Sequence, residues 1–200
     1  MLIDHSDEQM MRLLVNATRQ AELKGPVLAE AHRDVGRRLA GSVARHLILE
    51  DVEIRHVTGV STGVQVKVGK EPIIVAVMRA GLFLAEGVWS SLPDSSLVLH
   101  SDRTSLDTSP MEGRTVIIAD SVINTGRSIR DVLNAVVALQ PACIAVVTLV
   151  AYRTNLEALV DEFPDVYFHV ARISDRSYIG RGNTDTGARL FGTTTWSDEV

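Results

Sequence analysis

The sequence predicts an α/β fold with a central, mostly parallel sheet flanked by helices. Three continuous apolar runs suit strands that are covered on both faces, and they lie at residues 72–77, 115–119 and 143–150. Helical patterns separate or follow these runs, at residues 82–90, 128–139 and 154–163. Because strand and helix alternate, the sheet should have right-handed crossovers and bind ligands at the carboxyl ends of its strands.

The segment before these strands is expected to be mainly helical. Sequences with the form of capping boxes, at Ser6–Gln9 and Thr154–Glu157, predict where two helices begin. Apolar residues at helical spacing predict a further helix over Val27–Val43. Residues 52–68 alternate in polarity, which predicts two strands around a turn of glycine, serine and threonine at residues 59–63.

Composition restricts the classes of partner. The 200 residues fit one domain, and the 46% hydrophobic and 22% charged fractions are ordinary for a soluble globular chain. A net charge of −5 without a basic block argues against nucleic-acid binding. The apolar runs are too short to span a bilayer, the N-terminus lacks a signal-peptide core, and the single cysteine, Cys143, suits a reducing compartment. We therefore expect a cytoplasmic protein without membrane or nucleic-acid partners.

The most informative stretch is VIIADSVINTGRS, residues 116–128. An apolar strand that passes at once into a turn and a helix directs free N–H groups and the helix dipole at one spot, which suits a phosphate. Thr125 and Ser128 would add hydroxyl donors, Gly126 close backbone approach and Arg127 charge. Asp120 would face a neutral polyol such as ribose, because a carboxylate repels phosphate. The alternative is that Asp120 and Ser128 only cap a turn and a helix.

Residues 116–128 resemble the phosphoribosyl pyrophosphate (PRPP) motif of type I phosphoribosyltransferases, and the uracil phosphoribosyltransferase branch is the most similar. VAVMRAGLFLAEGV, residues 75–88, and YIGRGNTDTGARLFGT, residues 178–193, resemble two further segments of that branch, in the same order. The resemblance extends from about residue 25 to the end. It implies a single domain over residues 1–200, with a helical segment at 1–48, a core at 49–173 and a C-terminal hood at 174–196 over the base site.

The resemblance also implies roles for individual residues. PRPP binding is implied for Arg79, Arg103, Asp120, Ser121, Val122, Ile123, Asn124, Thr125, Gly126, Arg127, Ser128 and Asp185. Uracil binding is implied for Tyr178, Ile179, Thr184, Asp185 and Thr186. Arg79 and Asp185 are the expected catalytic residues, and the expected cofactor is Mg²⁺, carried by PRPP with Asp185 as a candidate ligand.

The residues themselves leave alternatives open. Arg79 could pair with a structural carboxylate, Asp185 could form a turn, and Tyr178 could belong to the core. The six histidines show no ligand spacing and are expected to be surface or satisfied core residues; they are His5, His32, His46, His56, His100 and His169. The polar segment 101–113 is a candidate lid over the site.

The chain departs from the uracil pattern at several positions. Ser121, Asn124 and Arg127 replace proline, alanine and glycine in the PRPP loop. In the hood, proline, glycine, alanine and aspartate are replaced by Arg181, Thr184, Thr186 and Ala188.

The leading hypothesis is a homo-oligomeric enzyme of pyrimidine salvage that joins uracil to PRPP, giving UMP and pyrophosphate. One alternative is the same fold acting on another base, because Arg181 could favour a more anionic substrate. Another is a catalytically weak regulator that senses PRPP or a nucleotide.

Overall fold

A computed structural model of the chain describes residues 1–101, 110–178 and 180–194 and confirms the α/β fold. Over these residues seven strands form one sheet, in which all pairings are parallel. The strand order is β1-β8-β7-β6-β4-β5, and β9 pairs with β7. The strands are β1 (Leu2–Asp4), β4 (Ile73–Val77), β5 (Ser96–His100), β6 (Thr115–Ile123), β7 (Cys143–Tyr152), β8 (Val166–Val170) and β9 (Ile173–Ser174).

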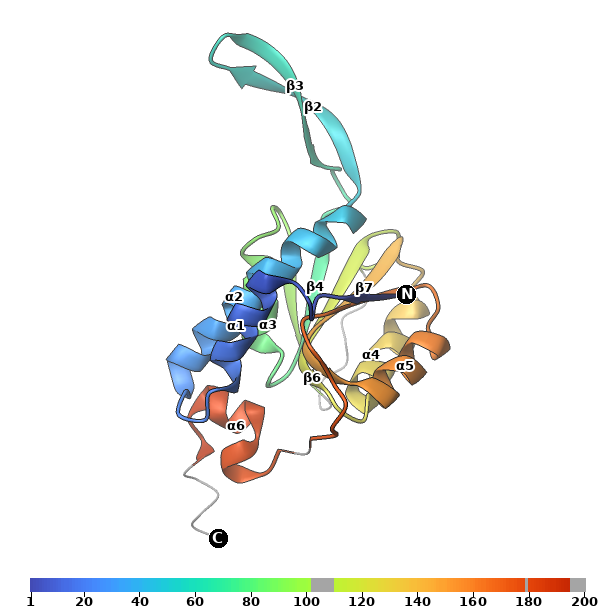
Figure 1. Ribbon diagram of the computed structural model, residues 1–200. Coiled ribbons are helices and arrows are strands. Elements are labelled where there is room, and N and C mark those ends of the chain that lie inside the picture. Colours follow the sequence, from blue (N-terminus) through green and yellow to red (C-terminus); the bar gives the residue numbers. More distant parts are fainter. Residues whose placement is uncertain (102–109, 179, 195–200) are drawn as a thin grey trace.

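Helices cover both faces of the sheet, as Figure 1 shows. On one face lie α1 (Gln9–Arg19), α2 (Gly25–Val43) and α3 (Leu82–Trp89), and on the other lie α4 (Arg127–Val137) and α5 (Arg153–Glu162). A short 3-10 turn, η1 (Ala44–His46), follows α2. The hood contains the 3-10 turn η2 (Gly182–Thr184) and the helix α6 (Thr186–Phe191).

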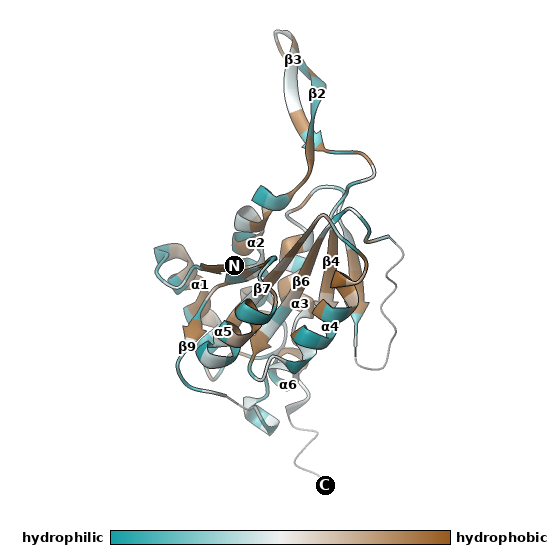
Figure 2. Cartoon of the chain, turned by 90° about the vertical axis from the view of Figure 1, so that its right-hand side faces the viewer, coloured by the Kyte–Doolittle hydropathy of each residue, from teal (hydrophilic) through white to brown (hydrophobic). Residues whose placement is uncertain are grey.

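Strand β6 divides the interior into two apolar cores. Val116 and Ile118 pack toward α4 and α5, whereas Ile117 and Ala119 pack toward α1, α2 and α3. This alternation is the two-residue period of a strand that is covered on both faces. Figure 2 shows β4, β6 and β7 coloured as hydrophobic between the layers of helices. The pattern explains why a continuous apolar run predicted these strands.

A separate antiparallel hairpin, β2 (Leu49–His56) and β3 (Gly59–Val66), projects away from the sheet (Figure 1). The two predicted strands are present, but the predicted turn was wrong. His56 pairs with Gly59, so the chain reverses at Val57 and Thr58, and residues 59–63 belong to β3. The arm leaves apolar side chains in solvent, including Val57 at 96% exposure.

Both predicted capping boxes were wrong. Helix α1 begins after Glu8, whose side chain makes no cap hydrogen bond, and the Ser6 hydroxyl instead donates to Asp4 Oδ1 at 2.5 Å. Helix α5 begins at Arg153, one residue before Thr154, and also lacks a side-chain cap. The four-residue pattern is short, and competing local hydrogen bonds decide where each helix starts.

Some expectations fall on parts of the chain outside the described residues. Arg103, most of the candidate lid and Ile179 are among them, as are the last two residues assigned to the hood. Strands β1, β5, β8 and β9 were not predicted, and β6 continues through Ile123, beyond its predicted end.

Candidate active site

The turn between β6 and α4 has the geometry of a phosphate-binding loop. Strand β6 ends at Ile123, helix α4 begins at Arg127, and Gly126 between them has a φ of 75°. A Cβ at Gly126 would lie 3.0 Å from Leu159 Cδ1, so both backbone conformation and packing favour glycine there. The Asn155 side chain donates to the Asn124 carbonyl at 2.6 Å and ties α5 to the loop. The first N–H groups of α4 therefore lie at the carboxyl edge of the sheet.

The hydroxyl and cationic side chains of this loop face solvent. Thr125 and Ser128 are exposed, and the side chain of Arg127 is 88% exposed, with its Nε 3.9 Å from Asp131 Oδ2. Such a loose exposed pair holds a side chain weakly, so Arg127 is able to turn toward an arriving anion. The loop is consistent with the roles expected of these three residues.

Asp120 is a buried carboxylate within β6, not at its tip. It is 9% exposed, its Oδ1 accepts a hydrogen bond from the Val122 N–H at 3.4 Å, and it forms no ion pair with a described cation. Burial raises its pKa to about 7. An ionised Asp120 can thus accept further hydrogen bonds that the described protein does not supply. A ligand with hydroxyl donors would require such an acceptor.

Ser121 leaves β6 on the opposite face and is used internally. Its hydroxyl donates to the Ala80 carbonyl at 2.7 Å and lies 2.9 Å from His32 Nδ1. Because the hydroxyl has a single hydrogen, it must accept from His32, which fixes the proton on Nδ1 and leaves Nε2 as an acceptor. Only the main chain of Ser121 remains available to PRPP.

His32 lies at the candidate site, and sequence reasoning missed it. It is 2% exposed and lines the pocket beneath the hood. Burial, with a smaller contribution from Arg189, lowers its pKa to about 4, so the ring is neutral at pH 7. The expectation of a satisfied core histidine accounts for Nδ1 but not for Nε2, which has no partner among the described residues.

Arg79 and Asp185 meet at the start of α6. Arg79 follows β4, the Met78–Arg79 peptide is cis, and the Arg79 side chain is exposed. A Cβ at Gly187 would lie 3.3 Å from Asp185 Oδ1 and 3.7 Å from Arg79 Nε, so both side chains border this glycine. Arg79 forms no ion pair with a described carboxylate, and its guanidinium lies 5.8 Å from the Phe191 ring. A structural pairing of Arg79 is thus not observed in the described part of the chain.

Asp185 caps α6. Its Oδ1 accepts from the Ala188 N–H at 2.6 Å, which leaves Oδ2 unengaged by the described residues. Asp185 therefore has the local structural role that the sequence left open. A ligand would have to bind its second oxygen, Oδ2.

Tyr178 lies over the candidate site, at the surface, and does not belong to the core. It is 46% exposed, its hydroxyl donates to the Thr184 carbonyl, and its N–H donates to Asn124 Oδ1 at 3.4 Å. The Thr184 hydroxyl bonds within η2, to the N–H and the carbonyl of Arg181 at 3.0 and 2.9 Å. The hood is therefore held to the PRPP loop through Tyr178, while the Thr184 side chain supports its fold.

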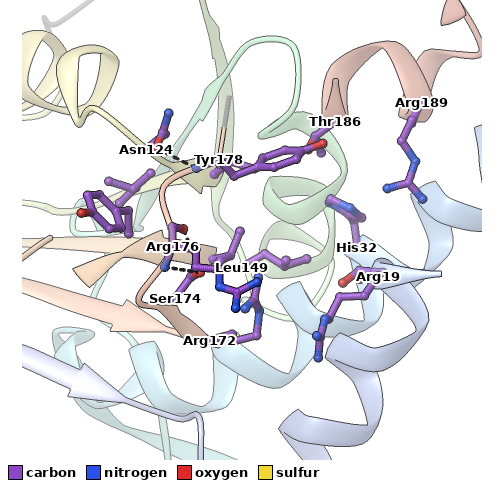
Figure 3. Close-up of a pocket in the computed structure, with 15 residues that line it drawn as sticks. Arg19, His32, Asn124, Leu149, Arg172, Ser174, Arg176, Tyr178, Thr186 and Arg189 are labelled. Atoms are coloured by element: carbon purple, nitrogen blue, oxygen red, sulfur yellow. Dashed lines mark hydrogen bonds between the residues drawn. The ribbon is translucent and has the colours of Figure 1, made fainter. Parts of the chain in front are cut away.

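A cavity of about 260 Å³ lies beneath Tyr178, at the carboxyl ends of β6 and β7 (Figure 3). Val122, Ile123 and Asn124 of the PRPP loop line it, together with Tyr178 and Thr186 of the hood. Thr184, Asp185 and Arg181 are not among the lining residues, and neither is Arg79. The structure thus joins part of the expected base site to the PRPP loop.

Four arginines also line this cavity, and none of them was predicted: Arg19, Arg172, Arg176 and Arg189. Arg189 is held by the carbonyls of Gln20 and Leu23, at 2.6 and 2.8 Å from its Nη2. One of the four could have been found from the sequence. Arg172 follows the buried strand β8, just as Arg79 follows β4, but residues 166–170 were not assigned as a strand.

The described residues hold neither a cluster of metal ligands nor a membrane-spanning helix. No group of three or more histidine, cysteine, aspartate or glutamate side chains there could hold a metal ion. No described helix has the length and apolar character needed to cross a membrane.

Known proteins are similar to this chain in sequence. The sequence model of the uracil phosphoribosyltransferase family matches residues 5–193. Uracil phosphoribosyltransferase of Staphylococcus carnosus is 28% identical over 94% of this chain and 96% of its own length. The enzyme of Macrococcus caseolyticus is 31% identical over 80% of this chain and 83% of its own.

Solved structures agree on the fold. The AQ2163 protein from Aquifex aeolicus superimposes with a TM-score of 0.82 at 22% identity, over 96% of this chain and 98% of that one. A hypoxanthine-guanine phosphoribosyltransferase from Bacillus anthracis gives a TM-score of 0.50 at 13% identity, over 81% and 88% of the two chains. The resemblance noted in the three sequence segments is thereby confirmed, and this chain belongs to the uracil phosphoribosyltransferase family.

Proposed function

We propose that this protein transfers the 5-phosphoribosyl group of PRPP to uracil and releases pyrophosphate, forming UMP. The observation that carries the proposal is the β6–α4 loop beside the hooded cavity, with the buried carboxylate of Asp120 on β6 just before the loop. The names and coverage of the relatives support the same conclusion.

PRPP would use three parts of the site. Its 5′-phosphate would bind the N–H groups at the start of α4 and the hydroxyls of Thr125 and Ser128. Its ribose hydroxyls would donate to Asp120, whose carboxylate has unused acceptor capacity. Its pyrophosphate would contact Arg79, which is exposed and forms no ion pair with a described carboxylate.

The described residues fit Mg²⁺ as a partner of PRPP and not as a metal bound by the protein alone. Mg²⁺ commonly uses one or two carboxylates together with substrate phosphates, and no cluster of three ligand side chains is found in the described chain. The second carboxylate oxygen of Asp185 would serve such a complex, because the side chains of Asp185 and Arg79 both border Gly187. The bound ion would neutralise charge on the departing pyrophosphate.

The protein would contribute binding, orientation and exclusion of water. The bond between C1 of the ribose and the pyrophosphate oxygen breaks, and a bond from C1 to the ring nitrogen forms with loss of the nitrogen's proton. Positioning of the two reactants and stabilisation of developing charge supply most of the rate in such transfers. Tyr178 and Thr186, which line the cavity, would hold the base against the PRPP loop.

The test is pyrophosphate release with PRPP, Mg²⁺ and uracil, with adenine, hypoxanthine and cytosine as alternative bases. Release that depends on uracil and is lost in Asp120→Asn supports the proposal. PRPP binding without release from any base would favour a PRPP-sensing regulator instead. If pyrophosphate is released only with a base other than uracil, phosphoribosyl transfer stands as the reaction, and uracil is rejected as the substrate.

Two further expectations stay proposals. We propose a homo-oligomer, supported by the projecting hairpin with Val57, Val60 and Val64 in solvent. The molar mass in solution, measured by light scattering, tests it, and the monomer mass at micromolar concentration would reject it.

We propose a cytoplasmic location, supported by the single cysteine, Cys143, and fractionation of cells tests it.

A further inference from the structure

The cavity beneath the hood is cationic to a degree that a neutral base does not require. Arg19 comes from the last turn of α1, Arg172 and Arg176 lie on either side of β9, and Arg189 lies on α6. Figure 3 shows these four side chains, the arginine cluster, around the same hollow as Tyr178 and His32. Segments remote in the sequence therefore bring like charges together. Water screens the exposed Arg19 and Arg176, whereas Arg172 and Arg189 are half-buried, and the repulsion is least screened between those two.

The described protein does not supply a compensating negative charge there. No aspartate or glutamate is among the residues that line the cavity. Arg19, Arg172 and Arg176 form no ion pair with any carboxylate that the structure describes, and the nearby Asp175 is bonded to Arg153 Nε at 2.5 Å. Arg189 binds only backbone carbonyls, which carry no net charge.

Arg172 has a buried donor without an acceptor in the described chain. Its Nε is buried and has no hydrogen-bond partner among the described residues. Burial, and after it the charge of Arg19, lower the pKa of its guanidinium. A buried charged donor without an acceptor is destabilising, and such groups are retained where a ligand supplies the missing partner.

His32, which also lines this cavity, offers an acceptor without charge. His32 is neutral, and its Nε2 can accept one hydrogen bond but cannot balance the arginines. A ligand that satisfies both features carries an oxyanion and also an N–H donor. A pyrimidine ring with a carboxylate substituent meets that description, and 260 Å³ is near the lower end of small-molecule sites.

We propose that the arginine cluster is an oxyanion-binding subsite of the base pocket, which takes a carboxylate on the acceptor base or a separate small oxyanion bound beside it. The inference rests on the proposed function, because it places the subsite next to the transferred base. The cation responsible is not Arg181, which the sequence suggested as a source of preference for anionic substrates. Arg181 does not line the cavity, and its N–H and carbonyl bond to Thr184.

Calorimetric titration of four ligands into the full-length protein tests the subsite: uracil, uracil-6-carboxylate, uracil-5-carboxylate and inorganic phosphate. We expect at least one carboxylated uracil to bind about tenfold more tightly than uracil, because a charge-assisted bond adds that much affinity. The advantage should shrink as salt is raised and should be lost in Arg172→Gln. Arg37→Gln is the matched control, since Arg37 lies on the outer side of α2 and pairs with Glu30 and Asp34.

The ligands distinguish the two sources of the oxyanion. Phosphate binding that depends on Arg172, with no advantage for the carboxylated bases, assigns the subsite to a separate small anion. The proposal is overturned if uracil binds as tightly as both carboxylated forms and no phosphate binding depends on Arg172. It is also overturned if Arg172→Gln leaves the advantage of the carboxylated forms intact. Circular dichroism confirms that the variant is folded, and the salt dependence of the unmodified protein tests the subsite independently of any variant.

Pyrophosphate release, measured separately with each base, keeps the two proposals distinguishable. Turnover of uracil with no oxyanion binding would leave the proposed function standing and reject the subsite. Oxyanion binding that depends on Arg172, without pyrophosphate release from any base, would support the subsite and reject the proposed function.

Discussion

Asp120→Asn should separate catalysis from stability, because the same buried carboxylate affects the two in opposite directions. Asparagine keeps the size of the side chain but removes its charge. The variant should lose the negative charge and one of the two acceptor oxygens that the ribose hydroxyls would use. This loss should lower kcat/KM for PRPP by about 10- to 100-fold, equivalent to a charge-assisted contact of about 1.5–3 kcal/mol. At the same time the variant should be more stable than the unmodified protein above neutral pH.

The size of the stability effect follows from the pKa of Asp120, which burial raises from 3.8 to about 7. The folded state therefore holds this proton more tightly than the unfolded state. The associated stability is fully present below the unfolded pKa and is lost as the pH rises through about 7. The shift of about three units, at about 1.4 kcal/mol each, corresponds to about 4 kcal/mol in total, of which about 3 kcal/mol falls between about pH 4.5 and 8.5.

Urea unfolding of both proteins across this pH range measures the effect, because other titrating groups cancel in the difference. The unfolding free energy of the variant, relative to the unmodified protein, should rise by about 3 kcal/mol from the acidic to the basic end. In parallel, turnover of the unmodified enzyme at limiting PRPP should rise with pH through about 7, as Asp120 ionises. A difference in stability that does not change with pH would refute the assignment of a raised pKa, and normal turnover by the variant would refute the ribose role.

Three further substitutions test other parts of the site. Arg79→Ala should lower kcat/KM for PRPP by about 10- to 100-fold with an unchanged unfolding midpoint, and a matching loss of stability would instead indicate a structural role. Gly126→Ala should cost about 1–3 kcal/mol in urea unfolding, because its φ is 75° and the new methyl meets Leu159; an unchanged midpoint would contradict this. His32→Leu should raise KM for the base about tenfold and leave KM for PRPP unchanged, and equal effects on both would reject His32 as a base contact.

The sequence determined the layers of this protein and the place of its phosphate loop. Short apolar runs rich in valine and isoleucine are typical of strands that are covered on both faces, which is why β4, β6 and β7 were predictable from their residues alone. The Asp120–Ser128 segment could be recognised because a strand, a turn and a helix start are adjacent in the chain. Local features that depend on exact register were less predictable, as the misplaced turn of the hairpin and the two absent capping boxes show.

Only the tertiary structure decided which side chains meet at the cavity beneath the hood. Arg19 and Arg172 are 153 residues apart in the chain, and they become neighbours because α1 packs beside the end of β8, a strand that periodicity did not reveal. His32 likewise acquires its neutral form from burial and from Ser121 across the interface of α2 with β6. The charge and burial at a pocket depend on elements that are distant in the sequence. A local sequence pattern can therefore predict the phosphate loop, but it cannot predict the cationic character of the pocket beside it.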